Sequence, residues 1–299
     1  MPSFQVLLFV FIFPSFLFCY EYSLTVLAIF QNEAPYLEEW IGYHHMVGVE
    51  HFILYNHFST DDFMDILEPY VASGLVELRD CMCREYPKAL LVTYQEGISK
   101  EKERSKWLAL IDIDEFIVPK EHPTIDKFLL EYEEAAGIVI NWQIFGTSGI
   151  KSLNGASLLE NLIRKFPEDF DSAWNSNHFV KSIIRPDRVD ESTKDPNCGN
   201  HVFMPLDGYF IVNSDHIAQP LLCKNPSIII DKMQINHYWF RDEEWFYKNK
   251  IKRREEVGES YSQGFIDWLF ENGNIEKDLW IQPFVQPEPY SLCLKPLKP

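Results

Sequence analysis

Apolar blocks separated by amphipathic segments run along the first half of the chain and predict alternating strands and helices. Residues 24–30 (LTVLAIF) form a continuous apolar run, as expected of a strand covered on both faces. Pro35 suits the first turn of a following helix, and Gly48 ends it. The helix repeats its apolar face at near-helical spacing at Leu37, Trp40, Ile41, His44 and Val47. Residues 51–56 (HFILYN) are then expected to form a second strand.

The same alternation continues through the next sixty residues. A helix is predicted over 61–71, a strand over 75–80, a polar helix over 93–104 and a strand over 107–118. Strands that alternate with helices indicate an α/β protein, with a mostly parallel sheet and helices on both faces. In such sheets ligands bind beyond the carboxyl ends of the strands.

The pattern becomes irregular after another strand predicted at 137–146. Turn-forming residues and mixed charges dominate from 155 to 208, and a helix is predicted over 241–256. Shorter strand candidates are 179–186, 208–213 and 227–239. Because no repeat and no clear linker interrupt the chain, we expect one domain over 21–299 with an irregular C-terminal half.

Residues 1–20 are predicted to be a signal peptide or another hydrophobic N-terminal segment. An apolar run from Val6 to Phe18 contains only Pro14 and Ser15 as interruptions, which is short for a membrane span of roughly 20 residues. The positive residues that usually precede such a run are missing. A signal anchor and a buried segment are the alternatives. We therefore expect a secretory or membrane-associated protein, with a cytoplasmic location as the alternative and membrane contact only through this segment.

Composition and charge narrow the class of function. The 299 residues are 46% hydrophobic and 15% aromatic, which indicates a packed globular protein, and the formal net charge is -18. Such a field repels phosphate backbones, so nucleic acid is not an expected partner. A small anionic ligand would need a metal ion or a few well-placed Lys and Arg residues to offset the acidic surroundings.

The stretch 107–119 (WLALIDIDEFIVP) places carboxylates in an apolar run. In a strand, Asp112 and Asp114 point to one face and the isoleucines between them to the other. Two carboxylates where a strand leaves the sheet make a hard-oxygen site for Mn²⁺ or Mg²⁺. The alternative is that they cap a turn or pair with Lys and Arg. Glu115 would face the other way, as support for the ligands or in a structural ion pair.

Several segments resemble glycosyltransferase family 92 and its relatives of the family 2 type. In order along 24–254 they are QNEAPYLEEWIGYHHMVGVEHFILYNHFSTDD, KWLALIDIDEFIVP, NWQIFGTSG, KSIIRP, HVF and INHYW, followed by a lysine-containing helix. The resemblance implies a GT-A fold. It also implies that Asp112 and Asp114 form an Asp-x-Asp motif that holds a divalent metal against a nucleotide sugar.

Further donor and metal contacts follow from the resemblance by position. Asn32 and Glu33 would contact or brace the nucleotide, with a helix cap as the alternative. The segment NHFSTDD would hold the base and ribose, through Asn56 and Asp61 among others, although it departs from the Asp-Asp-Gly-Ser form common in similar proteins. His237 would be a third metal ligand, or else a core histidine bonded to a backbone carbonyl.

Lys181 and Arg185, in KSIIRP, are the candidate cations for the pyrophosphate, and surface charges are the alternative. Asp112 would contact the donor as well as the metal.

The resemblance implies a metal-dependent glycosyltransferase that moves a sugar, a hexose by preference, from a nucleotide sugar to a glycan or other hydroxyl acceptor. UDP-sugar is the expected donor. If the reaction inverts configuration, as the resemblance implies, a carboxylate must accept the hydroxyl proton. Asp171 is the preferred base, and Asp169, Asp207 and Glu243 are the alternatives. A metal-dependent sugar-phosphate or nucleotide hydrolase and a non-catalytic carbohydrate-binding relative remain the rival readings.

Overall fold

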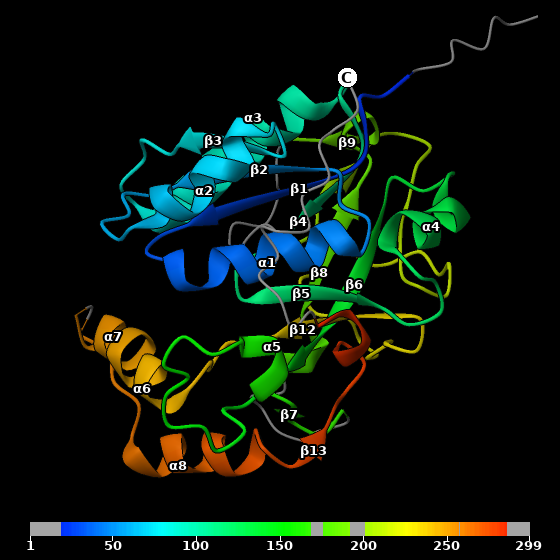
Figure 1. Ribbon diagram of the computed structural model, residues 1–299. Coiled ribbons are helices and arrows are strands. Elements are labelled where there is room, and N and C mark those ends of the chain that lie inside the picture. The colour runs from blue at the N-terminus through cyan, green and yellow to red at the C-terminus, as the bar shows by residue number, and fades with distance from the viewer. Residues whose placement is uncertain (1–18, 169–175, 192–200, 257, 286–299) are drawn as a thin grey trace, which may run out of the picture.

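A computed structural model of the chain describes residues 19–168, 176–191, 201–256 and 258–285 (Figure 1). Its centre is a nine-stranded sheet in the order β3-β2-β1-β4-β8-β6-β12-β5, with β11 paired to β6. The strands are β1 (Tyr22–Phe30), β2 (His51–Asn56), β3 (Val76–Asp80), β4 (Ser105–Leu110), β5 (Glu115–Pro119), β6 (Gly137–Ile144), β8 (Val180–Ile184), β11 (Ile211–Val212) and β12 (Met233–His237). Only β8 and β5 run against the others, which confirms the predicted mostly parallel sheet.

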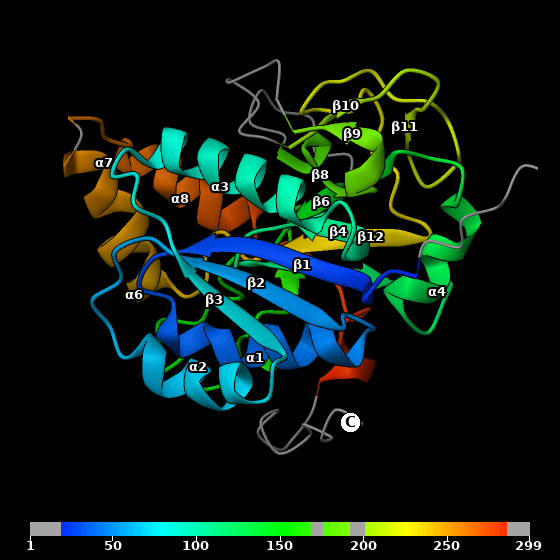
Figure 2. The ribbon, with the colours of Figure 1, turned by 90° about the horizontal axis from the view of Figure 1, so that it is seen from above.

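Helices cover both faces of the sheet (Figure 2). On one face lie α1 (Ala34–Met46) and α2 (Phe63–Ala72), whose Trp40 and Leu67 are fully buried with one side of β1 and β2. On the other lies α3 (Tyr86–Glu101), which buries Ala89 and Tyr94. This helix begins seven residues before the predicted 93–104, because its first turns also supply side chains to the core.

The second half of the chain contains mostly short elements, as predicted. They are α4 (Ile125–Leu129), α5 (Leu158–Asn161), α6 (Glu243–Trp245), α7 (Lys252–Glu256), α8 (Gln263–Asn272), β7 (Arg164–Lys165), β9 (Val189–Asp190), β10 (Met204–Pro205) and β13 (Glu276–Lys277). The helix expected over 241–256 is present as α6, a π-helical segment (Phe246–Ile251) and α7. An aromatic cluster that includes Phe166, Phe240 and Phe246 packs this segment against α8.

The single strand predicted over 107–118 is wrong. β4 ends at Leu110, and β5 begins at Glu115 and pairs with antiparallel β12. Between them the chain turns, because the Glu115 N–H donates to the Asp112 carbonyl (3.1 Å) and the Trp40 indole N–H donates to the carbonyls of both residues (3.1 and 2.9 Å). Asp112 and Asp114 therefore belong to a turn that α1 anchors, and their shared position does not come from one face of a strand.

Two predictions about organisation stay predictions. Residues 1–18 of the expected signal peptide lie outside the described residues, and one domain over 21–299 is consistent with the continuous sheet without being tested by it. Within the part of the chain that the structure describes, no helix has the length and apolar character needed to cross a membrane.

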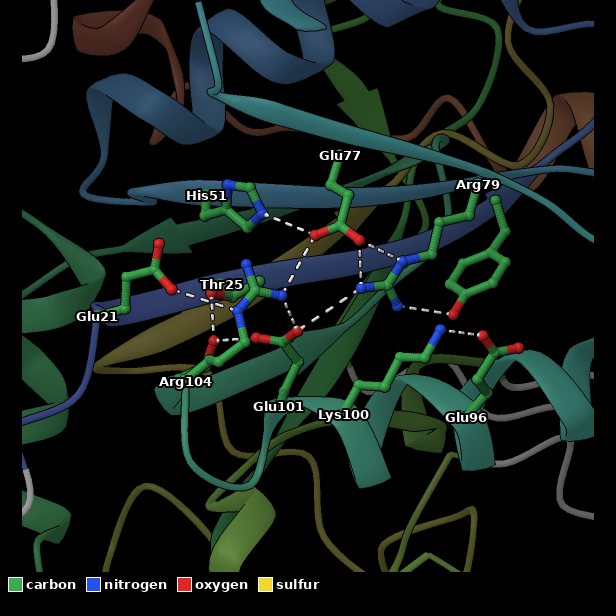
Figure 3. Close-up of polar contacts among 11 residues, drawn as sticks. Glu21, Thr25, His51, Glu77, Arg79, Glu96, Lys100, Glu101 and Arg104 are labelled. Atoms are coloured by element: carbon green, nitrogen blue, oxygen red, sulfur yellow. Dashed lines mark hydrogen bonds and ion pairs between the residues drawn. The ribbon is translucent and has the colours of Figure 1, made fainter.

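An ionic network around the buried Glu101 joins α3 to the sheet at the end of β4 opposite Asp112 (Figure 3). Glu101 is fully buried and accepts hydrogen bonds from Arg104 (2.8 Å) and from the hydroxyl of Ser105 (2.6 Å). Glu77 receives hydrogen bonds from Arg79 (2.7 Å) and Arg104 (3.2 Å). Because Glu101 has a guanidinium partner, its carboxylate is buried without being an unpaired charge.

We expect Glu77→Gln to weaken the acid sensitivity of the fold. Burial alone would raise the pKa of Glu77, but the hydrogen bonds from Arg79 and Arg104 lower it below the ordinary 4.5. A lowered pKa contributes stability above its ordinary value, and that contribution is lost as the pH falls through the folded value. Urea unfolding at neutral pH and at about pH 3 should therefore show a smaller loss of unfolding free energy in E77Q than in wild type. Exposed Glu68→Gln is the control, and identical pH dependence in E77Q and wild type would contradict the assignment.

Candidate functional site

Two adjoining pockets lie at the carboxyl ends of β1 and β4. The first, about 290 Å³, is lined by Asp112, Asp114 and His237 among others, and we call it the acidic pocket. The second, about 400 Å³, is called the basic pocket, and its cationic lining residues are Lys248, Lys250, Lys252 and Arg253. The residues that line both are Gln31, Glu33, Asp114, Lys250 and Arg253. The carboxylates of the acidic pocket and the cationic side chains of the basic pocket therefore lie in one continuous depression.

Asp112 is held by a buried lysine. Lys181 is 1% exposed, and its ammonium donates to Asp112 Oδ2 at 2.8 Å and lies 3.6 Å from Glu115 Oε2. Glu115 also accepts from the Asp112 N–H at 3.0 Å, which fits its predicted supporting role. Burial raises the pKa of Glu115 well above its usual range, although Lys181 opposes this. Burial would lower the pKa of Lys181, but the two carboxylates raise it. Lys181 is therefore a fixed cation beside the two carboxyl groups, and it favours the ionised form of Glu115 against the effect of burial.

Asp114 lies between a histidine and a second lysine. Its Oδ1 is 3.5 Å from His237 Nε2, and its Oδ2 is 3.5 Å from the ammonium of Lys250. Burial alone would raise the pKa of Asp114, but Lys250 and His237 hold it well below its usual range. His237 reaches this position because it ends β12, where the antiparallel register pairs it with Glu115. The predicted closeness of Asp112, Asp114 and His237 thus has a structural basis in β12.

The side chains around the acidic pocket fit a hard divalent cation. The carboxylates of Asp112 and Asp114 and the imidazole of His237 are suitable ligands in its lining, and among the described residues Asp112 Oδ1 and His237 Nδ1 are buried atoms without a hydrogen-bond partner. Over the described ranges, these side chains are not already gathered into a group of three that could hold a metal. Instead, Lys181 contacts Asp112 and Lys250 contacts Asp114. A divalent cation in the acidic pocket would therefore share each of these carboxylates with a lysine.

Glu33 follows β1 and points to the shared wall of the two pockets. Its Oε2 accepts from the guanidinium of Arg241 at 2.6 Å. Arg241 is 1% exposed and lies against the rings of Tyr36 (3.8 Å) and Trp245 (4.1 Å). Burial raises the pKa of Glu33, and Arg241 opposes that rise. Glu33 precedes α1 but makes no side-chain cap hydrogen bond, so the capping alternative is wrong for it.

The polar loop after β2 holds the loop after β1 in place. Asn32 lines the basic pocket in a left-handed conformation (φ 57°), and its Oδ1 accepts from the Thr60 N–H at 2.7 Å. Asp61 accepts from the Ala34 N–H at 2.8 Å, at the start of α1. Asn56 donates to the carboxylate at the end of β3. Asn56 and Asp61 line neither pocket, so the structure gives them bracing contacts, and their contact with the donor stays a prediction.

Arg185 is not brought to the site, and that prediction is wrong. It follows the far end of β8, where its guanidinium donates to Asp187 (3.2 Å) and to the Tyr20 hydroxyl (3.0 Å). Because β8 runs antiparallel to β4, each residue after Lys181 lies farther from Asp112.

The candidate bases are not gathered at the pockets either. Asp207 is exposed, and the residue before it donates its N–H to the Arg188 carbonyl, beyond the start of β6. Glu243 begins α6 and lines neither pocket. Asp169 and Asp171 lie outside the described residues. Asp207 and Glu243 are therefore not supported as bases.

The sequence interpretation missed the cations that do reach the pockets. Lys250 and Arg253 line both, and Tyr86 at the start of α3 lines the acidic pocket with Arg253 over its ring at 5.0 Å. A signal was present, because five of the seven residues in 248–254 are Lys or Arg in a chain with a net charge of -18. The π-helical turn that aims Lys250 inward has no comparable sequence signature.

Comparison with known proteins identifies the family of this chain. The family model of glycosyltransferase family 92 matches residues 21–266. A glycosyltransferase family 92 protein of Ricinus communis is 23% identical over 266 residues, covering 86% of this chain and 41% of that protein. A galactan β-1,4-galactosyltransferase of Arabidopsis thaliana is 25% identical over 129 residues, covering 40% of this chain and 25% of that protein. The chain thus spans about two fifths of the first relative's length.

Among solved structures, TarS of S. aureus in complex with UDP-GlcNAc is a distant likeness. It is 12% identical with a TM-score of 0.39, covering 83% of this chain and 70% of that chain. The strand order, the acidic turn after β4 and the family match agree with the predicted GT-A type of α/β fold. The match over residues 21–266 confirms the predicted resemblance, and the chain belongs to glycosyltransferase family 92.

Proposed function

We propose that this chain is a metal-dependent glycosyltransferase that moves a hexose from a UDP-sugar to a hydroxyl of a glycan. The main support is the meeting of opposite charges at the carboxyl end of the sheet, where Asp112 and Asp114 adjoin Lys250 and Arg253. This combination suits a nucleoside diphosphate, because basic side chains bind its phosphates and the carboxylates would hold a divalent cation that offsets their charge.

The residues around the two pockets then have the following roles. Asp112, Asp114 and His237 would hold Mn²⁺ or Mg²⁺, which when bound offsets the charge that develops on the departing diphosphate. Lys250 and Arg253 bind phosphate oxygens from the basic pocket. Further support comes from Lys181, which keeps Asp112 oriented, and from Glu33 and Asn32, which brace the donor at the end of β1.

The chemistry needs an acceptor hydroxyl and a base. The hydroxyl attacks the anomeric carbon, its proton passes to a carboxylate, and the bond from that carbon to the diphosphate breaks. Asp171 stays our candidate base, with Asp169 as its alternative. Because one relative is named a galactan β-1,4-galactosyltransferase, UDP-galactose is the first donor to test and a β-1,4-galactan oligosaccharide is the first acceptor. The apolar run within residues 1–20 supports a secretory or membrane-associated location.

The test is nucleotide release from a panel of UDP-sugars and GDP-sugars with and without a glycan acceptor. We expect UDP release that depends on both the acceptor and Mn²⁺ and stops when EDTA removes the metal. Equal release with water alone would support a hydrolase. Absence of any nucleotide-sugar binding would support a non-catalytic relative, and either result would refute the transferase proposal.

A further inference from the structure

Lys250 occupies an unusual place at the boundary of the two pockets. It lies in the π-helical segment Phe246–Ile251, and its ammonium is 5.2 Å from the ring of Trp239 and 5.4 Å from that of Trp245. The same ammonium is 3.5 Å from Asp114 Oδ2. One side chain therefore lines the acidic pocket beside a carboxylate and also lines the basic pocket beside other cationic residues. π-Helical turns occur frequently at functional sites.

The two lysines at the site are held differently. Lys181 is 1% exposed and makes a 2.8 Å hydrogen bond to Asp112 with Glu115 on its other side, so its position is fixed. Lys250 is 26% exposed, and its ammonium is 3.5 Å from Asp114 Oδ2, which is longer than an ordinary N–H···O hydrogen bond. Asp114 is itself shared with His237, whose Nε2 lies 3.5 Å from Oδ1, so this carboxylate does not serve Lys250 alone. Four rotatable bonds allow the lysine to reach a better anionic partner.

We propose that Lys250 competes with the divalent cation for Asp114 and that, once displaced, it binds the diphosphate of the donor. This inference rests on the proposed function. Two cations at one carboxylate repel each other, so binding of the metal favours movement of the ammonium away from Asp114. The diphosphate then offers that ammonium a charge-assisted hydrogen bond. Lys250 therefore couples the binding of the metal to the binding of the nucleotide.

The competition predicts opposite effects of Lys250→Met on two ligands. With MnCl₂ alone, calorimetry should show Mn²⁺ binding about fivefold tighter than in wild type, because the competing charge is gone. With Mn²⁺ at saturation, UDP should bind about tenfold more weakly, because a phosphate contact is lost. Lys100→Met is the matched control, since Lys100 is an exposed lysine that pairs with Glu96 on α3 and lines neither pocket. It should change neither affinity by more than about twofold.

The opposite signs separate competition from a structural role. If Lys250→Met weakens both ligands, or changes neither, the competition is refuted while the transferase proposal stands. If neither wild type nor Lys250→Met binds Mn²⁺, the metal site itself fails as well. Should Lys250→Met not fold, as judged by its thermal unfolding, Lys250→Gln provides the same comparison.

Discussion

Replacing Asp114 by Asn is expected to weaken the binding of UDP in the presence of Mn²⁺ by at least about 100-fold. The substitution keeps the size of the side chain but removes the charge that lies between His237 and Lys250. A neutral amide is a poor ligand for a hard cation, and its NH₂ group would point a donor at one of these neighbours. Calorimetric titration of UDP into protein with saturating Mn²⁺ measures the effect.

The control for this prediction is Asp65→Asn, which removes one exposed aspartate on α2 away from both pockets. It should leave the affinity for UDP unchanged. A melting temperature for Asp114→Asn close to that of wild type shows that the loss is not one of folding. Retention of UDP affinity within about threefold in folded Asp114→Asn would contradict the assigned role.

Lys181→Met is expected to lower the free energy of unfolding by about 3 kcal/mol, the largest stability effect predicted for this site. Lys181 is the only positive partner of Glu115 among the ion pairs of the described residues, and Glu115 is fully buried. Methionine fills the volume of the lysine stem but leaves the carboxylates of Glu115 and Asp112 without their cation. Breaking a buried pair from one side costs more than removing the whole pair.

A double-mutant cycle tests this coupling through urea unfolding. Glu115→Gln in the Lys181→Met background should restore at least half of the lost unfolding free energy, because it removes the buried charge that Lys181 balances. The glutamine can still accept the Asp112 N–H that Glu115 accepts at 3.0 Å. If the two substitutions are additive, Lys181 does not act as the counter-ion of Glu115.

The local pattern of the chain predicted the first part of the fold well. The strand at 24–30, the helix after Pro35 and the strand at 51–56 all form within a residue or two of the expected bounds. Each has an apolar period that matches its own geometry, so neighbouring residues alone decide it. The turn between β4 and β5 could not be predicted this way. Residues 111–114 contain no Gly or Pro, and Trp40 from α1 and the distant strand β12 impose the turn.

The site shows the same division between local and long-range information. Asp112 and Asp114 are two residues apart in sequence and were found from their chemistry, whereas His237 came from the family resemblance and lies beside them because of strand register. Lys250 and Arg253 were missed because more than 100 residues separate them from Asp114, and only the packing of a π-helical segment brings them close. The spacing of neighbouring residues in the sequence does not predict such long-range contacts.

The central claim is that one depression holds both a divalent cation and the diphosphate of a nucleotide. A crystal structure of the protein grown with UDP and Mn²⁺, with anomalous diffraction measured for manganese, tests it most directly. We predict one manganese peak bound by Asp112, Asp114 and His237, with UDP in the adjoining pockets and its phosphates against Lys250 and Arg253. UDP bound elsewhere on the molecule, or bound in the depression with no manganese at the three ligands, would contradict the account.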